Sequence, residues 1–177
     1  VYVRDTEWEA ANSLYIWRDG GPGMDWRSAK SLPTKKDRAS VLTLAIASLL
    51  MRAGERVAIL GESERPRAGR VGYERLTQRL ARSEGAQERL NGKLPAHAKL
   101  LLASDFLTDP DAWPQRLATL AARPASGIIL HIIDPAEESF PFKGRVEFAT
   151  PGGWLSPYLL GRAERAKTEY RARCEGH

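Results

Sequence analysis

The chain has 177 residues and a mass of 19.7 kDa, the size of one ordinary domain with a substantial core. Hydrophobic residues make up 42% and charged residues 28%, a composition that excludes a disordered chain. The longest strongly apolar run, 41–51, is about half as long as a bilayer requires. We therefore predict a single domain over residues 1–177 that has no membrane span.

Charge and cysteine content limit the possible partners and the cellular compartment of the protein. The formal net charge is +5 and the pI about 9.6, but basic and acidic residues are interleaved along the chain. Because nucleic-acid binding usually needs a concentrated basic patch, no nucleic-acid partner is expected, whereas an acidic partner stays open. Cys174 is the single cysteine, which excludes an internal disulfide and fits a reducing, cytoplasmic setting. The chain begins at Val1 without a methionine and without a signal-peptide pattern, so we expect the natural N-terminus to lie upstream.

The first elements are marked by turn residues and a helix cap. The aromatic and β-branched run 13–17 predicts a strand that delivers Asp19 into the glycine-rich loop 20–23. Thr34 is the expected N-cap of a helix that ends near Gly54. Apolar residues cover nearly the whole circumference of this helix, so we expect it to be packed deep in the fold.

The rest of the chain continues to alternate between strands and helices. The predicted elements are a strand at 56–60, a helix from Tyr73, a strand at 99–103, a helix from Asp109, a strand at 127–133 buried on both faces, an edge strand at 144–149 and a last helix from Ser156. This alternation predicts an α/β fold with three layers, in which helices cover both faces of a doubly wound, mostly parallel sheet of the Rossmann-like kind.

Three aspartates follow predicted strands. Asp19, Asp105 and Asp134 would lie beyond the carboxyl ends of the strands, where such sheets form their binding crevice. Carboxylates meeting there could bind Mg²⁺. Aspartate is equally common as the residue that caps the turn or helix after a strand, so spacing alone leaves both interpretations open.

Three segments resemble a known family. Residues 17–24 (WRDGGPGM) lie where von Willebrand factor A domains carry an Asp-x-Ser-x-Ser metal motif, and residues 104–106 (SDF) lie where they carry a later aspartate. The segment 134–145 (DPAEESFPFKGR) is similar to the bacterial group called domain of unknown function 58, and the resemblance covers nearly the whole chain. It implies a von Willebrand factor A-like domain.

This chain departs from the metal motif in a way that weakens the expected metal site. Gly21 and Gly23 stand at the two serine positions of the motif, so two hydroxyl ligands are missing. Asp19 and Asp105 remain as the metal ligands that the resemblance implies. A hard cation with so few fixed ligands binds weakly, and we expect a degenerate site that is empty or weakly occupied by Mg²⁺, with no other cofactor.

Other candidate chemistry is sparse. His131 lies within an apolar strand and has no nucleophile beside it in the sequence, so a structural role is expected. The glycine-rich loop lacks the lysine-serine ending of a phosphate-binding loop. Glu137 and Glu138 are adjacent and are expected to serve a turn or an interface instead of acting as a catalytic pair. No catalytic residue is predicted.

The resulting hypothesis is a protein-interaction module that is not an enzyme. Members of the resembled family occur with AAA+ ATPases of the MoxR type, which implies an adaptor or chaperone-like role beside such an ATPase. The expected contact residues are Asp19, Met24, Asp25, Trp26 and Asp105. Two alternatives stay open: a Mg²⁺-dependent ligand-binding domain that uses Asp19 and Asp105, and a hydrolase with an acidic crevice.

Overall fold

The computed structural model describes most of the central part of the chain. The described residues are 13–62, 65–82, 94–95, 97–107, 113–120, 126–143, 167–168 and 171–172. Their elements are β1 (Ser13–Arg18), the short 3-10 helix η1 (Pro22–Asp25), α1 (Lys35–Arg52), β2 (Arg56–Ile59), α2 (Gly69–Arg82), β3 (Lys99–Ser104), α3 (Trp113–Leu120), β4 (Ser126–His131) and α4 (Pro135–Ser139). Strands and helices alternate as predicted, and the α/β class is confirmed.

The four described strands form one parallel sheet in the order β2-β1-β3-β4. From β1 the chain moves outward to β2, and it then returns to place β3 on the other side of β1. The winding direction therefore reverses between β1 and β3. In open parallel sheets this reversal opens a crevice at the carboxyl ends of the two strands.

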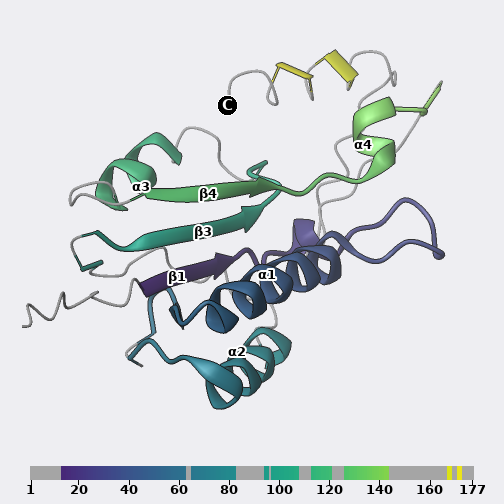
Figure 1. The fold of residues 1–177 in the computed structure, drawn as a ribbon. Helices are drawn as coiled ribbons and strands as arrows, with labels where there is room; N and C mark the ends of the chain where they lie inside the picture. Colours follow the sequence, from purple (N-terminus) through teal and green to yellow (C-terminus); the bar gives the residue numbers. More distant parts are fainter. Residues whose placement is uncertain are drawn as a thin grey trace, which may run out of the picture.

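Alternating side chains divide the core into two layers around the sheet. Leu14 and Ile16 of β1 face α1 and α2, whereas Tyr15 and Trp17 face the side of α3. Trp113 of α3 packs edge to face against Trp17, with ring centroids 5.6 Å apart. Figure 1 shows the sheet between α3 on one side and α1 with α2 on the other. The predicted three-layer arrangement is present.

Helix α1 has the predicted ends but lies nearer the surface than expected. The Thr34 hydroxyl accepts a hydrogen bond from the backbone N–H of Asp37, and Gly54 takes a φ of 89° just beyond the helix. Val41 and Leu49 are each 66% exposed, so the expectation that the whole helix is buried is wrong. The face that packs inward carries mainly small residues, which let the helix lie close to the sheet; its buried residues are Lys35, Ala39, Thr43, Ala47 and Met51.

Strand β4 also differs from its prediction. It lies at one edge of the four-stranded sheet, and its Ile128 and Ile129 side chains are more than half exposed, so the expected burial on both faces is wrong among the described residues. The predicted edge strand 144–149, the start of the last helix at Ser156, and Cys174 lie outside the described residues. No helix in the described ranges is long and apolar enough to cross a membrane.

A matched pair of leucines tests the position of the core. Leu101 in β3 is completely buried, so we expect Leu101→Ala to lower the free energy of unfolding by about 2–5 kcal/mol. Leu49→Ala on the exposed face of α1 should change it by less than about 0.5 kcal/mol. Urea unfolding followed by circular dichroism measures both. Equal losses would contradict the layer assignment.

Candidate functional site

The carboxyl ends of β1 and β3 bring the predicted aspartates to neighbouring strands. Asp19 directly follows β1, and Ser104 and Asp105 lie at the end of β3. The backbone N–H of Asp19 donates to the carbonyl of Ala103 over 2.8 Å, which continues the ladder past the last residue of β1. Both aspartates are almost completely buried. The expected meeting of these strand ends is therefore present.

Both carboxylate oxygens of Asp19 are held within the protein. Oδ1 accepts from the backbone N–H of Gly21 at 2.7 Å, and Oδ2 accepts from the Ser104 hydroxyl at 2.6 Å. The same hydroxyl oxygen accepts from the backbone N–H of Phe106 at 3.0 Å. Phe106 has a φ of 54°, a left-handed conformation that is uncommon for a bulky residue. The sequence prediction missed the role of Ser104, although the residue directly precedes Asp105.

Lys35 is the residue that the sequence prediction missed most clearly. It is the first residue of α1 and only 4% exposed. Its Nζ donates to Oδ2 of Asp105 at 2.8 Å and to Oε1 of Glu137 at 2.6 Å, and it lies 5.8 Å from the ring centroid of Trp26. A cation at a helix N-terminus opposes the helix dipole, so a lysine directly after an N-cap was the available signal.

Helix α4 carries Glu137, the second acid that Lys35 contacts, and the cap of this helix holds the Glu137 side chain in place. Asp134 caps this helix by accepting from the backbone N–H of Ala136 at 2.8 Å, while Oε2 of Glu137 accepts from the backbone N–H of Asp134 at 2.8 Å. The other oxygen of Asp134 accepts from the backbone N–H of Ser28 at 3.0 Å. Asp134 is thus a cap that also ties the loop after β1 to α4. Glu137, expected to serve only a turn or an interface, belongs to the site.

The charges in this cluster stabilise one another. Burial alone would lower the pKa of Lys35, but the adjacent Asp105 and Glu137 outweigh it and raise the pKa above its ordinary value of 10.5. Burial would likewise raise the pKa of Asp134, but hydrogen bonds from Ser28 and Ala136, with the nearby Lys35 charge, lower it below 3.8. The ammonium and the Asp134 carboxylate are therefore both charged at neutral pH.

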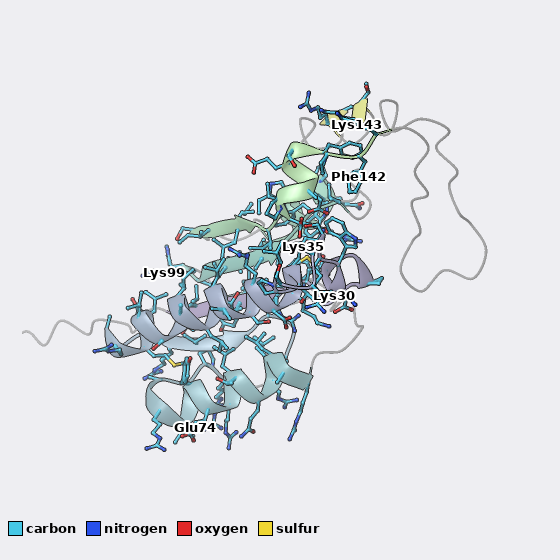
Figure 2. All side chains as sticks on the ribbon, turned by 90° about the vertical axis from the view of Figure 1, so that its right-hand side faces the viewer. Lys30, Lys35, Glu74, Lys99, Phe142 and Lys143 are labelled. Carbon is cyan, nitrogen blue, oxygen red and sulfur yellow. The ribbon has the colours of Figure 1, made fainter. Side chains whose placement is uncertain are left out.

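The predicted contact residues differ in exposure. Met24 is 1% exposed and packs with Ala39, Ala103 and Ile132, so its side chain belongs to the core and not to the surface. Asp25 is exposed and forms an ion pair with Lys36. Trp26 is partly exposed beside Lys35. Figure 2 looks at this end of the sheet and places Lys35 near its centre, between Lys30 and Phe142.

The donor set does not fit the divalent cation that the resemblance implies. A Cβ built at Gly23 would lie 3.4 Å from Oδ2 of Asp105, so the position of the second missing hydroxyl is indeed beside this carboxylate. That oxygen instead binds the ammonium of Lys35. The two carboxylate oxygens of Asp19 already accept hydrogen bonds from the Gly21 backbone N–H and the Ser104 hydroxyl. Within the described ranges, no three His, Cys, Asp or Glu side chains are grouped as a metal site requires.

Family membership rests on a match over most of the chain. The model of the family described as "protein of unknown function DUF58" matches residues 1–173. The chain therefore belongs to this family. No curated protein and no solved structure matches it.

The Lys35 ammonium can be tested by an uncharged replacement of similar length. Lys35→Met leaves the Asp105 and Glu137 carboxylates facing each other without a counter-charge, and we expect the free energy of unfolding to fall by about 3–5 kcal/mol. Lys36→Met, at a partly exposed lysine one residue away, should cost less than about 1 kcal/mol. Urea unfolding compares them. A small effect at Lys35 would contradict the buried triad.

Asp134 gives a pH-dependent prediction. Because its folded pKa is lowered, its ionisation stabilises the protein fully above pH 3.8, and this contribution disappears as the pH falls through the folded pKa. Asp134→Asn should therefore be less stable than the wild type near pH 7, and the difference should shrink towards about pH 2. Urea midpoints across this range measure it. A difference that does not change with pH would contradict the assignment.

Proposed function

We propose that this chain is a non-catalytic protein-interaction module of the von Willebrand factor A type. In this proposal the carboxyl-end cluster holds the binding surface in shape, and the rim around it contacts a partner. The partner is an AAA+ ATPase of the MoxR type, and the chain works beside it in the cytoplasm as an adaptor. The parallel sheet with its switch point between β1 and β3 and the membership in the DUF58 family are consistent with this assignment.

The observation that carries the proposal is the buried contact of Lys35 with Asp105 and Glu137. The ammonium bonds the carboxylate that a metal ion would otherwise use, so the site has its own cation as part of the chain. A buried ammonium with two carboxylate partners holds α1, the end of β3 and α4 in a fixed arrangement. Because the charged groups of this cluster hydrogen-bond to one another, the cluster suits a rigid recognition surface better than a catalytic site.

The contact surface in this proposal is the rim of the cluster. Trp26 lies beside the Lys35 ammonium and is partly exposed, as an interface anchor would be. Asp25 is exposed next to it, in an ion pair with Lys36, and belongs to the proposed contact surface. The buried Asp19 holds the loop at Gly21, and the buried Asp105 holds Lys35, so both support the contact surface without being part of it. Met24 is also buried and is not part of the contact surface.

The Mg²⁺-dependent alternative would use the Asp105 carboxylate beside Gly23. Asp105 and Gly23 lie close enough that a hydroxyl at residue 23 would approach the carboxylate. For a cation to bind there, the ammonium of Lys35 would have to leave Oδ2 of Asp105. No contact in the described residues favours the hydrolase alternative.

Binding to the ATPase tests the proposed surface. We expect the double variant Asp25→Ala with Trp26→Ala to bind a MoxR-type ATPase about tenfold or more weakly, since an aromatic anchor dominates the energy of such contacts. Glu74→Ala, an exposed substitution on α2, is the matched control and should bind like the wild type. Biolayer interferometry with both purified proteins gives the dissociation constants.

Two outcomes would reject parts of the proposal. If the wild type does not bind the ATPase, or binds equally well in the double variant, the rim is not the contact surface. If chelation abolishes binding, and calorimetry shows micromolar Mg²⁺ affinity that is lost in Asp19→Ala, the metal-dependent alternative replaces the lysine-closed site. Binding that is unchanged by chelation supports the proposal.

A further inference from the structure

The loop between η1 and α1 is a closed, exposed element at the carboxyl end of the sheet. It comprises residues 26–34, and Figure 1 shows it reaching beyond the ends of the strands. The backbone N–H of Lys35 donates to the carbonyl of Trp26 over 3.2 Å, so the two ends of the loop lie side by side. Compact surface loops with joined ends keep a defined shape and frequently carry function.

Contacts within the loop and to α4 fix its shape before a partner binds. The backbone N–H of Leu32 donates to the carbonyl of Ala29 at 3.0 Å, and Nη1 of Arg27 donates to the Leu32 carbonyl at 3.3 Å. The backbone N–H of Ser28 donates to Oδ2 of Asp134 at 3.0 Å, which joins the loop to the start of α4. A surface with a fixed shape loses little conformational entropy when it binds.

The loop carries positive charge and no acid. Arg27 and Lys30 are its charged residues, and both are exposed. Lys30 and Ser31 are the central residues of the turn from Ala29 to Leu32, so the lysine lies at the tip of the loop. Within the described part of the chain, neither cation forms an ion pair with a carboxylate. Their charges are therefore available to another molecule.

The next two lysines of the chain differ from Lys30 in this respect. Lys35 binds Asp105 and Glu137, and its ammonium is buried. Lys36 forms an ion pair with an aspartate at the other end of the loop. The nearby carboxylates thus neutralise these two ammonium groups and leave the charge of the loop tip unbalanced.

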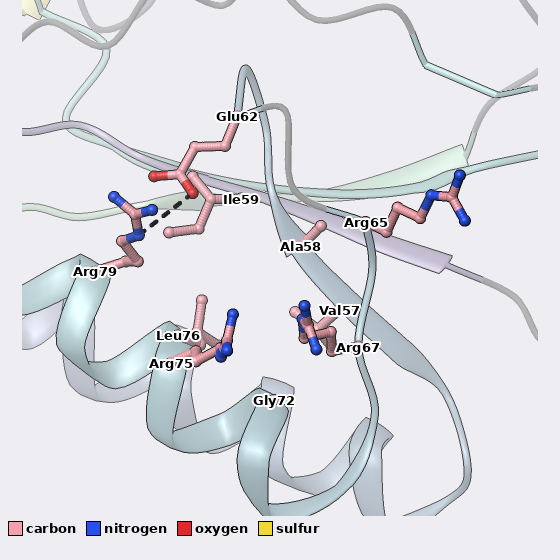
Figure 3. A pocket seen from close by; sticks show the side chains of 10 residues that line it. All are labelled: Val57, Ala58, Ile59, Glu62, Arg65, Arg67, Gly72, Arg75, Leu76 and Arg79. Atoms are coloured by element: carbon pink, nitrogen blue, oxygen red, sulfur yellow. Dashed lines mark ion pairs between the residues drawn. The ribbon is translucent and has the colours of Figure 1, made fainter.

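The arginines beside α2 are also partnered in part. Arg75 and Arg79 interact with other groups of the chain, and Arg79 lies 3.7 Å from Glu62 (Figure 3). The apolar residues that line the opening between β2 and α2 are buried in the core, namely Val57, Ala58, Ile59 and Leu76. This opening therefore offers a partner little apolar surface, and part of its charge is already paired.

We propose that the loop tip, defined by Arg27 and Lys30, binds an acidic patch on the surface of the partner protein. The inference rests on the proposed function, because the loop begins at Trp26, the aromatic anchor of the proposed contact surface. The guanidinium and ammonium groups would pair with aspartate and glutamate carboxylates of the partner. Complementary charge of this kind speeds association and favours the correct partner over others.

An anionic membrane or a nucleic acid fits the loop less well. Such membranes are recognised by clusters of about four to eight basic residues, and nucleic acids by a concentrated basic face. Exposed acids lie just beyond both ends of the loop, Asp25 before it and Asp37 after it. An extended negative surface would also meet these carboxylates, whereas a compact acidic patch would meet the tip alone.

The experiment uses the full chain and a purified MoxR-type ATPase in biolayer interferometry. Lys30→Glu should weaken binding about tenfold or more and Lys30→Gln less, because a reversed charge repels the carboxylates that the ammonium attracts. Lys30→Arg keeps the charge and should bind nearly like the wild type. Arg52→Glu makes the same change of charge at an exposed residue at the other end of α1, and should leave the affinity nearly unchanged. Circular dichroism verifies that each variant is folded.

Carbodiimide cross-linking tests the chemistry of the contact directly. The reagent joins a lysine amine to a carboxylate with which it is in contact. Mass spectrometry of the complex should therefore find Lys30 linked to an aspartate or glutamate of the ATPase. Lys99 at the start of β3, which pairs with Glu55, is the internal comparison and should not be linked to the ATPase.

The possible results distinguish this inference from the proposed function. If the wild type binds the ATPase but Lys30→Glu binds equally well, Arg52→Glu loses as much affinity, or no cross-link forms at Lys30, the acidic patch is rejected and the proposed contact surface stands. If the wild type does not bind, both are rejected. Tighter binding to anionic phospholipid vesicles or to a single-stranded oligonucleotide than to the ATPase, lost in Lys30→Glu, would also overturn the inference.

Discussion

The ion pairs of the Lys35 ammonium with Asp105 and Glu137 are the interaction on which the rest of the site depends. They join the start of α1, the end of β3 and the short helix α4, three parts of the chain that are remote in sequence. An ammonium and carboxylates are costly to bury separately, and the cost is offset only when they meet in good geometry. The contact therefore couples the positions of these three elements. The Asp19 and Ser104 contact adds the end of β1 to the same unit.

This constraint also explains the chemistry that the crevice favours. Winding of the sheet in two directions opens a space at the ends of β1 and β3, which α/β proteins commonly use for ligands. Here the space between the acids contains a side chain of the protein itself. Asp134 and Glu137 act in part as a helix cap, so the same carboxylates serve both local structure and the charge cluster. The proposed contact surface is the rim near Trp26, a residue that is partly exposed.

Apart from the carboxyl-end cluster, the opening between β2 and α2 is a second charged feature of the molecule. Within its described lining, four arginines and Glu62 surround it, and Arg79 lies 3.7 Å from Glu62. Both regions rely on close backbone packing for their shape. Phe106 turns sharply after β3, and Gly72 lets α2 approach the Arg67 loop.

Local chemistry in the sequence determined the element order and the strand-end positions of Asp19 and Asp105. The Thr34 cap and the stop at Gly54 follow from short-range patterns, and the structure confirms them. Tertiary structure decided which apolar residues are covered, and so Val41, Leu49 and β4 are more exposed than predicted. It also decided that Lys35 meets Glu137, 102 residues later in the chain. Periodicity and capping report on neighbouring residues, but the pairing of two distant charges depends on how the strands and helices pack.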